Sequence, residues 1–184
     1  MQSVKRVILM AVVMVLITPL LVAQHEETET NATSHELHEK FKVALTLGYT
    51  HIPAAFEEGH MEKSVFVPSV GLDLFYHLGD KWSLGLLADV ELKNYVVDFK
   101  REDLDREGVF ILTLVAGYKI LPNLEFLLGG GIEFESHKNL GVFRFGIERE
   151  ISIGDGWSVA PSAIFDFKED FNTYTLGFAI GKSF

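Results

Sequence analysis

The sequence contains no cysteine among its 184 residues. Disulfide bonds, thiolate metal sites and cysteine nucleophiles are therefore excluded. Basic residues are also scarce. The sequence has 16 Lys and Arg but 26 Asp and Glu, which gives a formal net charge of -10. Proteins bind nucleic acid through a basic surface, so this balance argues against a nucleic-acid partner.

Long apolar runs are missing everywhere except near the N-terminus. There, Lys5 and Arg6 precede an uncharged run from Val7 to Val22, and Leu21-Val22-Ala23 resembles a cleavage site. The run has about 16 residues, fewer than the roughly 20 of a membrane-spanning helix. We therefore interpret residues 1–23 as a cleaved signal peptide that exports the protein, the alternative being an uncleaved anchor. A lipoprotein signal would need cysteine.

Residues 24–39 are polar and acidic, with too few apolar side chains to fold alone. We expect a flexible acidic tail on the periplasmic side. Its histidines could bind Zn²⁺ or Cu²⁺, since imidazole and carboxylate groups are suitable ligands. These candidates are His25, His35 and His38. A solvated tail without metal is the favoured interpretation, and no cofactor is expected.

From residue 40 onward, apolar residues alternate with small or polar ones. This period of two is typical of β-strands that have two different faces. The predicted strands cover about 41–50, 63–77, 81–98, 107–120, 123–135, 140–152, 156–167 and 171–184. Strands of this length exceed the usual 5–6 residues of soluble sheets, and they suit a tilted crossing of a membrane.

The predicted connections alternate in length. Tight-turn residues occur at Gly79-Asp80, Pro122-Asn123 and 154–156, and longer or more charged links lie at 52–62, 99–106, 136–139 and 168–170. Short turns at one end and longer loops at the other indicate an all-β, eight-stranded antiparallel up-and-down transmembrane β-barrel over residues 40–184. A soluble lipocalin-like barrel or a sandwich, with the apolar face inside, is the alternative.

The less apolar face of these strands carries Gly, Ser, Thr and charges of both signs. Eight strands enclose a space that side chains fill, and charges placed there must pair because an unpaired buried charge is costly. The candidate lumen cluster comprises Asp89, Glu91, Lys93, Arg144 and Glu148. We interpret it as a structural salt-bridge plug, with a narrow polar path as the alternative.

The last strand resembles the C-terminal strand of bacterial outer-membrane proteins, which typically ends in Phe after apolar residues at alternate positions. The matching residues are Phe184, Ile180, Phe178, Leu176 and Tyr174, and Lys182 departs from the pattern. The resemblance is to small eight-stranded barrels of unassigned role, of the kind found in Bacteroidetes-type bacteria. It implies that the barrel-assembly machinery recognises this strand, and that outer-membrane lipids and lipopolysaccharide surround the barrel.

Four residues conflict with a regular barrel wall. Pro68 and Pro161 lie inside predicted strands, where each lacks a ladder donor and is expected to mark a bulge. Arg149 and Lys182 fall on the predicted apolar face near its short-turn end. We expect their charged groups to reach the lipid head groups while their stems lie along the apolar band.

Catalytic candidates are few. Glu148 and Glu150 share a strand face, as an acid and a base would, but no substrate cleft is evident. Ser136-His137 suggests a lipid esterase only if a turn brings the two side chains together. We therefore expect a non-enzymatic barrel with a structural, surface-contact or envelope-stabilising role. A low-conductance pore or carrier and a lipid-modifying enzyme are the alternatives.

Overall fold

The computed structural model describes residues 40–53, 55–56, 64–99, 102–169 and 171–184. The expectations for the signal peptide and for the acidic tail with its three histidines lie outside these residues. Within the described part of the chain, no helix has the length and apolar character needed to cross a membrane.

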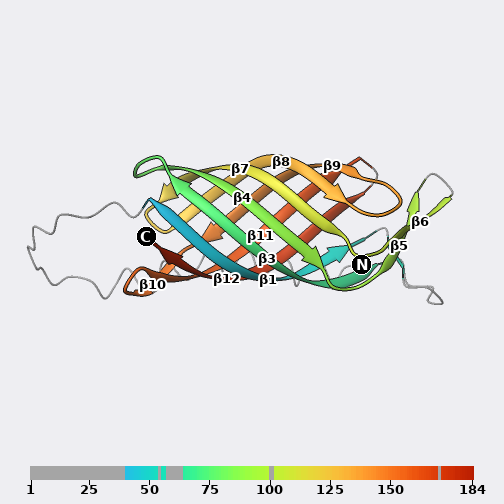
Figure 1. The fold of residues 1–184 in the computed structure, drawn as a ribbon, viewed down its shortest axis with the longest axis horizontal. Coiled ribbons are helices and arrows are strands. Elements are labelled where there is room, and N and C mark those ends of the chain that lie inside the picture. Colours follow the sequence, from blue (N-terminus) through green and yellow to red (C-terminus); the bar gives the residue numbers. More distant parts are fainter. Residues whose placement is uncertain (1–39, 54, 57–63, 100–101, 170) are drawn as a thin grey trace, which may run out of the picture. The chain divides into compact units, whose positions relative to one another are not determined.

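Eight antiparallel wall strands form a closed β-barrel (Figure 1). They are β1 (Phe41–Ile52), β3 (Val65–His77), β4 (Trp82–Glu91), β7 (Phe110–Leu121), β8 (Leu124–Phe134), β9 (Leu140–Arg149) continued by β10 (Ile151–Gly154), β11 (Trp157–Lys168) and β12 (Asn172–Ser183). Sequence neighbours pair in turn, and the pairing of β12 with β1 closes the ring. The predicted fold class is confirmed.

A second sheet lies at the loop end of the barrel. It has the order β2 (Ala55–Phe56), β5 (Tyr95–Phe99) and β6 (Glu102–Arg106). The single predicted strand 81–98 is therefore wrong, because β4 stops at Glu91 and the chain resumes as β5. The predicted loop 99–106 contains β6. The apolar positions change from even numbers in β4 to odd numbers at Tyr95 and Val97 in β5, and an alternating pattern does not itself specify which strand is the partner.

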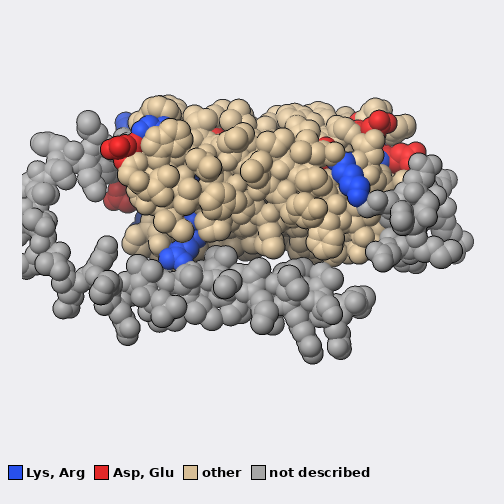
Figure 2. Space-filling view, turned by 90° about the horizontal axis from the view of Figure 1, so that it is seen from below, with Lys and Arg blue, Asp and Glu red and all other residues tan. Residues whose placement is uncertain are grey.

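The apolar face points outward. Leu45 is 55 % exposed and Leu114 is 61 % exposed, whereas the inward Asp166 is 2 % exposed. On the visible face in Figure 2, charged side chains gather near the two ends and leave an uncharged band between them. A continuous apolar band of this kind suits lipid rather than water. The soluble alternative, with its apolar face inside, is wrong.

Apolar side chains also fill parts of the interior. Near the loop end, a buried cluster includes Ile52, Val67, Val109 and Leu140. A second cluster joins four inward residues of β3, β4, β7 and β8, namely Phe75, Leu87, Val115 and Leu127. The sequence interpretation assigned mainly small and polar residues to this face, so it underestimated how much of the barrel is closed by packing.

The predicted bulges at the two prolines are wrong. Pro68 pairs with Tyr49 in an unbroken register, and its carbonyl accepts from the N–H of Leu92 at 2.9 Å, one residue beyond β4. The N–H that Pro68 lacks is therefore missing at the point where the hydrogen-bonded pairing of β3 with β4 ends. Pro161 lies opposite the break between β9 and β10, and the register is the same on both sides of the break. At both prolines the sheet loses one ladder hydrogen bond, but neither strand contains the extra residue of a bulge there.

The two basic residues of the apolar face have different environments. Arg149 is only 9 % exposed and pairs in register with Leu124, which is also buried. The expected exposed stem of Arg149 is therefore wrong. Lys182 donates to the carbonyl of Asp155 in the short turn, and its Nζ lies 5.6 Å from the centre of the Trp157 ring. This placement agrees with an ammonium group at the edge of the apolar band.

The outward face can be tested by placing one charge at two depths. Leu86 lies mid-strand on the outward face and pairs with Leu74 and Leu114. Leu86→Arg should reduce the free energy of unfolding from lipid vesicles by about 2–4 kcal/mol. The control Leu78→Arg, just beyond β3, should cost only about 0–1 kcal/mol. Equal costs for the two variants would contradict the assignment of the lipid-facing band.

Candidate functional site

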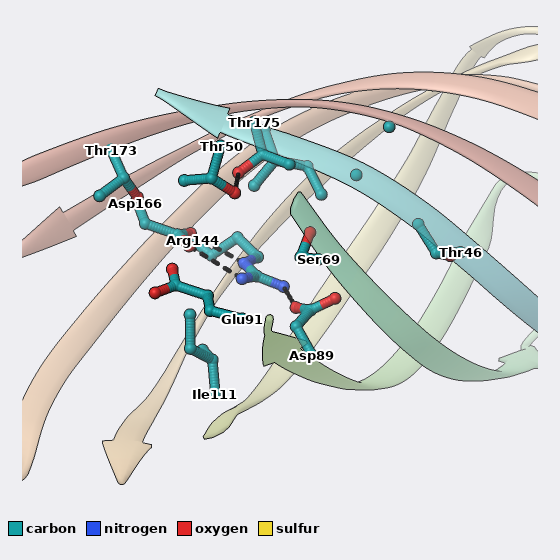
Figure 3. A pocket seen from close by; sticks show the side chains of 13 residues that line it. Thr46, Thr50, Ser69, Asp89, Glu91, Ile111, Arg144, Asp166, Thr173 and Thr175 are labelled. Atoms are coloured by element: carbon teal, nitrogen blue, oxygen red, sulfur yellow. Dashed lines mark hydrogen bonds and ion pairs between the residues drawn. The ribbon is translucent and has the colours of Figure 1, made fainter. Parts of the chain in front are cut away.

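Arg144 on β9 bridges the barrel interior (Figure 3). Its guanidinium donates from Nε and Nη2 to the two carboxylate oxygens of Asp166 on the neighbouring β11, each at 2.8 Å. Nη1 donates to Asp89 Oδ2 at 2.7 Å, and Asp89 lies on β4, three places along the sheet from β9. The side chain is 3 % exposed. One guanidinium thus connects well-separated parts of the barrel wall.

A small cavity lies beside this bridge. Its volume is about 20 Å³, and Glu91 and the hydroxyl groups of Thr50 and Ser69 are among its lining. That is space for about one water molecule. Glu91 is 4 % exposed. The cavity is too small for a solute at this level.

A second ion-pair layer lies toward the short-turn end. Lys42 Nζ on β1 is 3.1 Å from Glu148 and 2.9 Å from Glu150. Ser158 donates to Glu150 at 2.7 Å. Lys42 was not in the predicted cluster, although the alternation of the first strand places it on the inward face. The pair Glu148 and Glu150 therefore contacts a common ammonium group rather than forming an open acid–base site.

A third layer lies at the loop end and involves the second sheet. Arg106 of β6 is fully buried and ion-pairs with Glu133 of β8. Its Nη1 also donates to Glu135 at 3.3 Å and to the carbonyl of Lys138 at 2.7 Å. Lys168 of β11 makes a further ion pair with Glu133. We call the contacts of Arg106 with Glu133, Glu135 and Lys138 the Arg106 latch.

The sequence did not identify the Arg106 latch because Arg106 fell in a predicted loop. The predicted cluster itself is divided: Asp89 and Arg144 are in contact, and Glu91 lines the cavity beside them. Glu148 belongs to the Lys42 layer. Lys93 lies in the bend between β4 and β5, beyond the barrel wall. The functional role of the cluster stays a prediction.

Ser136 and His137 do meet at a turn, together with Glu135. Ser136 Oγ donates to Glu135 at 2.7 Å, and the same carboxylate oxygen lies 2.9 Å from His137 Nδ1. Ser136 Oγ also lies 3.4 Å from Nδ1. A hydrolytic triad needs serine at one ring nitrogen and the carboxylate at the other. Here both face Nδ1, so the imidazole is not placed to accept the serine proton at one ring nitrogen while the carboxylate orients the ring at the other.

Burial raises the pKa of the Glu135 carboxyl, but hydrogen bonds outweigh it and hold this pKa at about 2. The donors are the Ser136 hydroxyl, the His137 ring and the backbone N–H groups of His137 and Lys138. The hydrogen bond to Glu135 in turn raises the pKa of His137. The triplet therefore stabilises an ionised Glu135 facing Arg106, which is a structural arrangement.

The proposed assembly signal lies along β12. Tyr174, Leu176, Phe178 and Ile180 are exposed on its outward face, and Phe184 follows at the end. Their recognition by the assembly machinery stays a prediction. Within the described part of the chain, no group of three or more His, Asp or Glu side chains is placed to hold a metal ion.

Neither a scan of protein-family models nor a search of curated proteins finds a match. Solved structures do match. One is Ail, the attachment invasion locus protein of Yersinia pestis, in complex with the heparin analogue sucrose octasulfate: 14 % identity, TM-score 0.51, covering 79 % of this chain and 99 % of that chain. Another is Neisserial surface protein A: 8 % identity, TM-score 0.51, covering 78 % and 97 % respectively. The chain shares the fold of these small β-barrels.

The Arg106 latch predicts acid sensitivity at the loop end. Because the pKa of Glu135 is about 2 instead of 4.5, its stabilising contribution is complete above pH 4.5 and is lost as the pH falls toward 2. The protection factors of amide hydrogen exchange in β5 and β6, which correct for the intrinsic exchange rate at each pH, should therefore fall over this interval. In Glu135→Gln the amides of β5 and β6 should already be less protected at neutral pH, and their protection should depend much less on pH. An unchanged acid response in Glu135→Gln would rule out Glu135 as the titrating group.

Proposed function

We propose that this chain is a non-enzymatic outer-membrane barrel with a closed lumen, acting through its structure and its loop-end surface. The observation that carries this proposal is the bridge from Arg144 to Asp89 and Asp166 across the interior. The apolar clusters at both sides of the bridge support it, because packed side chains leave little room for a hydrated path.

The organised loop end supports a surface-contact role. The second sheet is joined to the barrel by the Arg106 latch, which is buried and has several partners. Loops joined by such contacts present a fixed surface, and loops on a rigid scaffold commonly carry binding functions. No described feature provides an activated nucleophile, since Ser136 and His137 lack the required geometry.

An outer-membrane location is supported by the exposed apolar band and by the barrel fold. Outer-membrane lipids and lipopolysaccharide are then the surroundings of the wall, and the barrel-assembly machinery is the expected partner during insertion. Origin in a Bacteroidetes-type bacterium stays a prediction, because the similar structures share only the fold.

The location can be tested by fractionating cells that express the full chain. We expect the protein with the outer-membrane fraction, with a mobility on unboiled gels that differs from that of the boiled sample. The compact barrel resists detergent until it is heated, which is the reason for the shift. Recovery as a soluble periplasmic monomer would contradict the proposal.

The closed lumen can be tested by removing the central guanidinium. Arg144→Ala leaves the buried Asp166 and the partly buried Asp89 without their cation, and should lower the free energy of unfolding by about 3–5 kcal/mol. The matched variant Arg144→Met/Asp89→Asn/Asp166→Asn removes both signs of charge and should recover much of the loss. Unfolding titrations in lipid vesicles measure both.

Planar-bilayer recordings on the same proteins separate a plug from a pore. The wild-type chain should show no steady conductance. In a water-filled path the charges would already be solvated, so Arg144→Ala would cost little stability and would change ion conductance. A stable Arg144→Ala barrel together with a conducting wild type would replace the present proposal with a narrow pore.

A further inference from the structure

Among the described strands, β6 lies at one edge of the loop-end sheet and β2 at the other. In the order β2-β5-β6, β6 pairs with β5 on one side, and no described strand pairs with its other side. The hairpin of β5 and β6 projects beyond the end of the barrel wall in Figure 1. Every second residue of such an edge directs its N–H and C=O away from the sheet, where another strand can pair with them.

This edge is held in a fixed position. Tyr95 and Val97 of β5 are buried in the loop-end apolar cluster, and Arg106 at the end of β6 forms the Arg106 latch. Register pairs Tyr95 with Arg106, so the base of the hairpin is bound by packing and by ion pairs at once. A preordered edge lowers the conformational cost of adding a strand.

The opposite face of the hairpin is acidic. Val96 pairs with Asp105, and Asp105 and the following Glu107 are exposed. They line an open hollow of about 560 Å³ together with His137, Asn94 and Arg106, whose guanidinium is ion-paired with Glu133 and Glu135. Asp105 and Glu107 contribute to the raised pKa of His137, after the larger effects of Glu135. A positive side chain placed beside Asp105 and Glu107 would meet the same attraction.

We propose that the outer edge of β6 receives an extended peptide segment of a partner protein, whose Lys or Arg side chains enter this hollow. The backbone of the segment would pair with β6 as a fourth strand, and alternate side chains would face Asp105 and Glu107. The proposal deepens the surface-contact role and depends on it, because it names the chemistry of the partner.

The test uses the full chain in nanodiscs of neutral phosphatidylcholine and a short fluorescent peptide in which Lys alternates with Thr. Anisotropy should show binding to loaded nanodiscs and not to empty ones, and the binding should weaken as salt rises. Replacing each Lys by Glu, or methylating alternate backbone nitrogens of the peptide, should abolish it. Equal binding of the methylated peptide would overturn strand addition.

The site is located with Asp105→Asn/Glu107→Gln, which keeps the shapes of both exposed side chains. Binding should weaken about three- to tenfold, as expected for two exposed ion pairs. Asp155→Asn removes one acidic charge from the exposed short turn at the other end and should leave binding unchanged. If the double variant binds as tightly as the wild type, the proposal is wrong. Conductance is recorded separately, so a pore would refute the closed lumen without affecting this result.

Discussion

Closure of the hydrogen-bonded ring is the constraint on which the rest of the structure depends. Each wall strand has a neighbour on both sides, and the last junction pairs β12 with β1 from Lys42↔Ser183 to His51↔Tyr174. In hydrocarbon an unpaired backbone group has no water to bind, so an open edge would be costly. Closure permits apolar side chains to cover the outer wall, and it also confines every inward side chain to a narrow interior.

That confinement explains the interior ion pairs. Arg144 bridges Asp89 and Asp166, Lys42 joins Glu148 to Glu150, and a third layer lies around Glu133. Each layer contains strands distant in sequence, so each basic group links parts of the wall that the backbone ladder does not connect directly. A buried charge without its partner is strongly destabilising, which ties the layers to the closed form of the barrel.

Buried ion pairs and apolar packing also hold the second sheet at the loop end of the barrel. Arg106, at the end of β6, connects the second sheet to the loop end of the barrel by pairing with Glu133 and Glu135. Apolar residues such as Ile52, Tyr95 and Leu140 pack beside these charges. The surface that we propose to contact a partner is therefore supported from below by buried interactions, and the outer side of β6 is one of the two edges of the second sheet among the described strands.

The sequence by itself determined the class of fold. Alternation with period two, tight-turn residues at three sites and long strands predicted eight antiparallel wall strands, because side-chain direction in a strand depends only on local geometry. It also placed Arg144, Asp89 and Glu148 on one face. The alternation could not decide whether that face was inside, since a soluble barrel and a membrane barrel have the same period.

Only the tertiary structure decided the direction of the faces and the partners of the charges. Arg144 contacts Asp166 and Asp89 but not Glu148, because contact follows strand order and register around the closed ring. Strand pairing also determines that β4 ends before β5 begins. It places Arg106, which the sequence assigned to a loop, at the loop end of the barrel interior. These features depend on residues far apart in the chain, which local periodicity does not relate to one another.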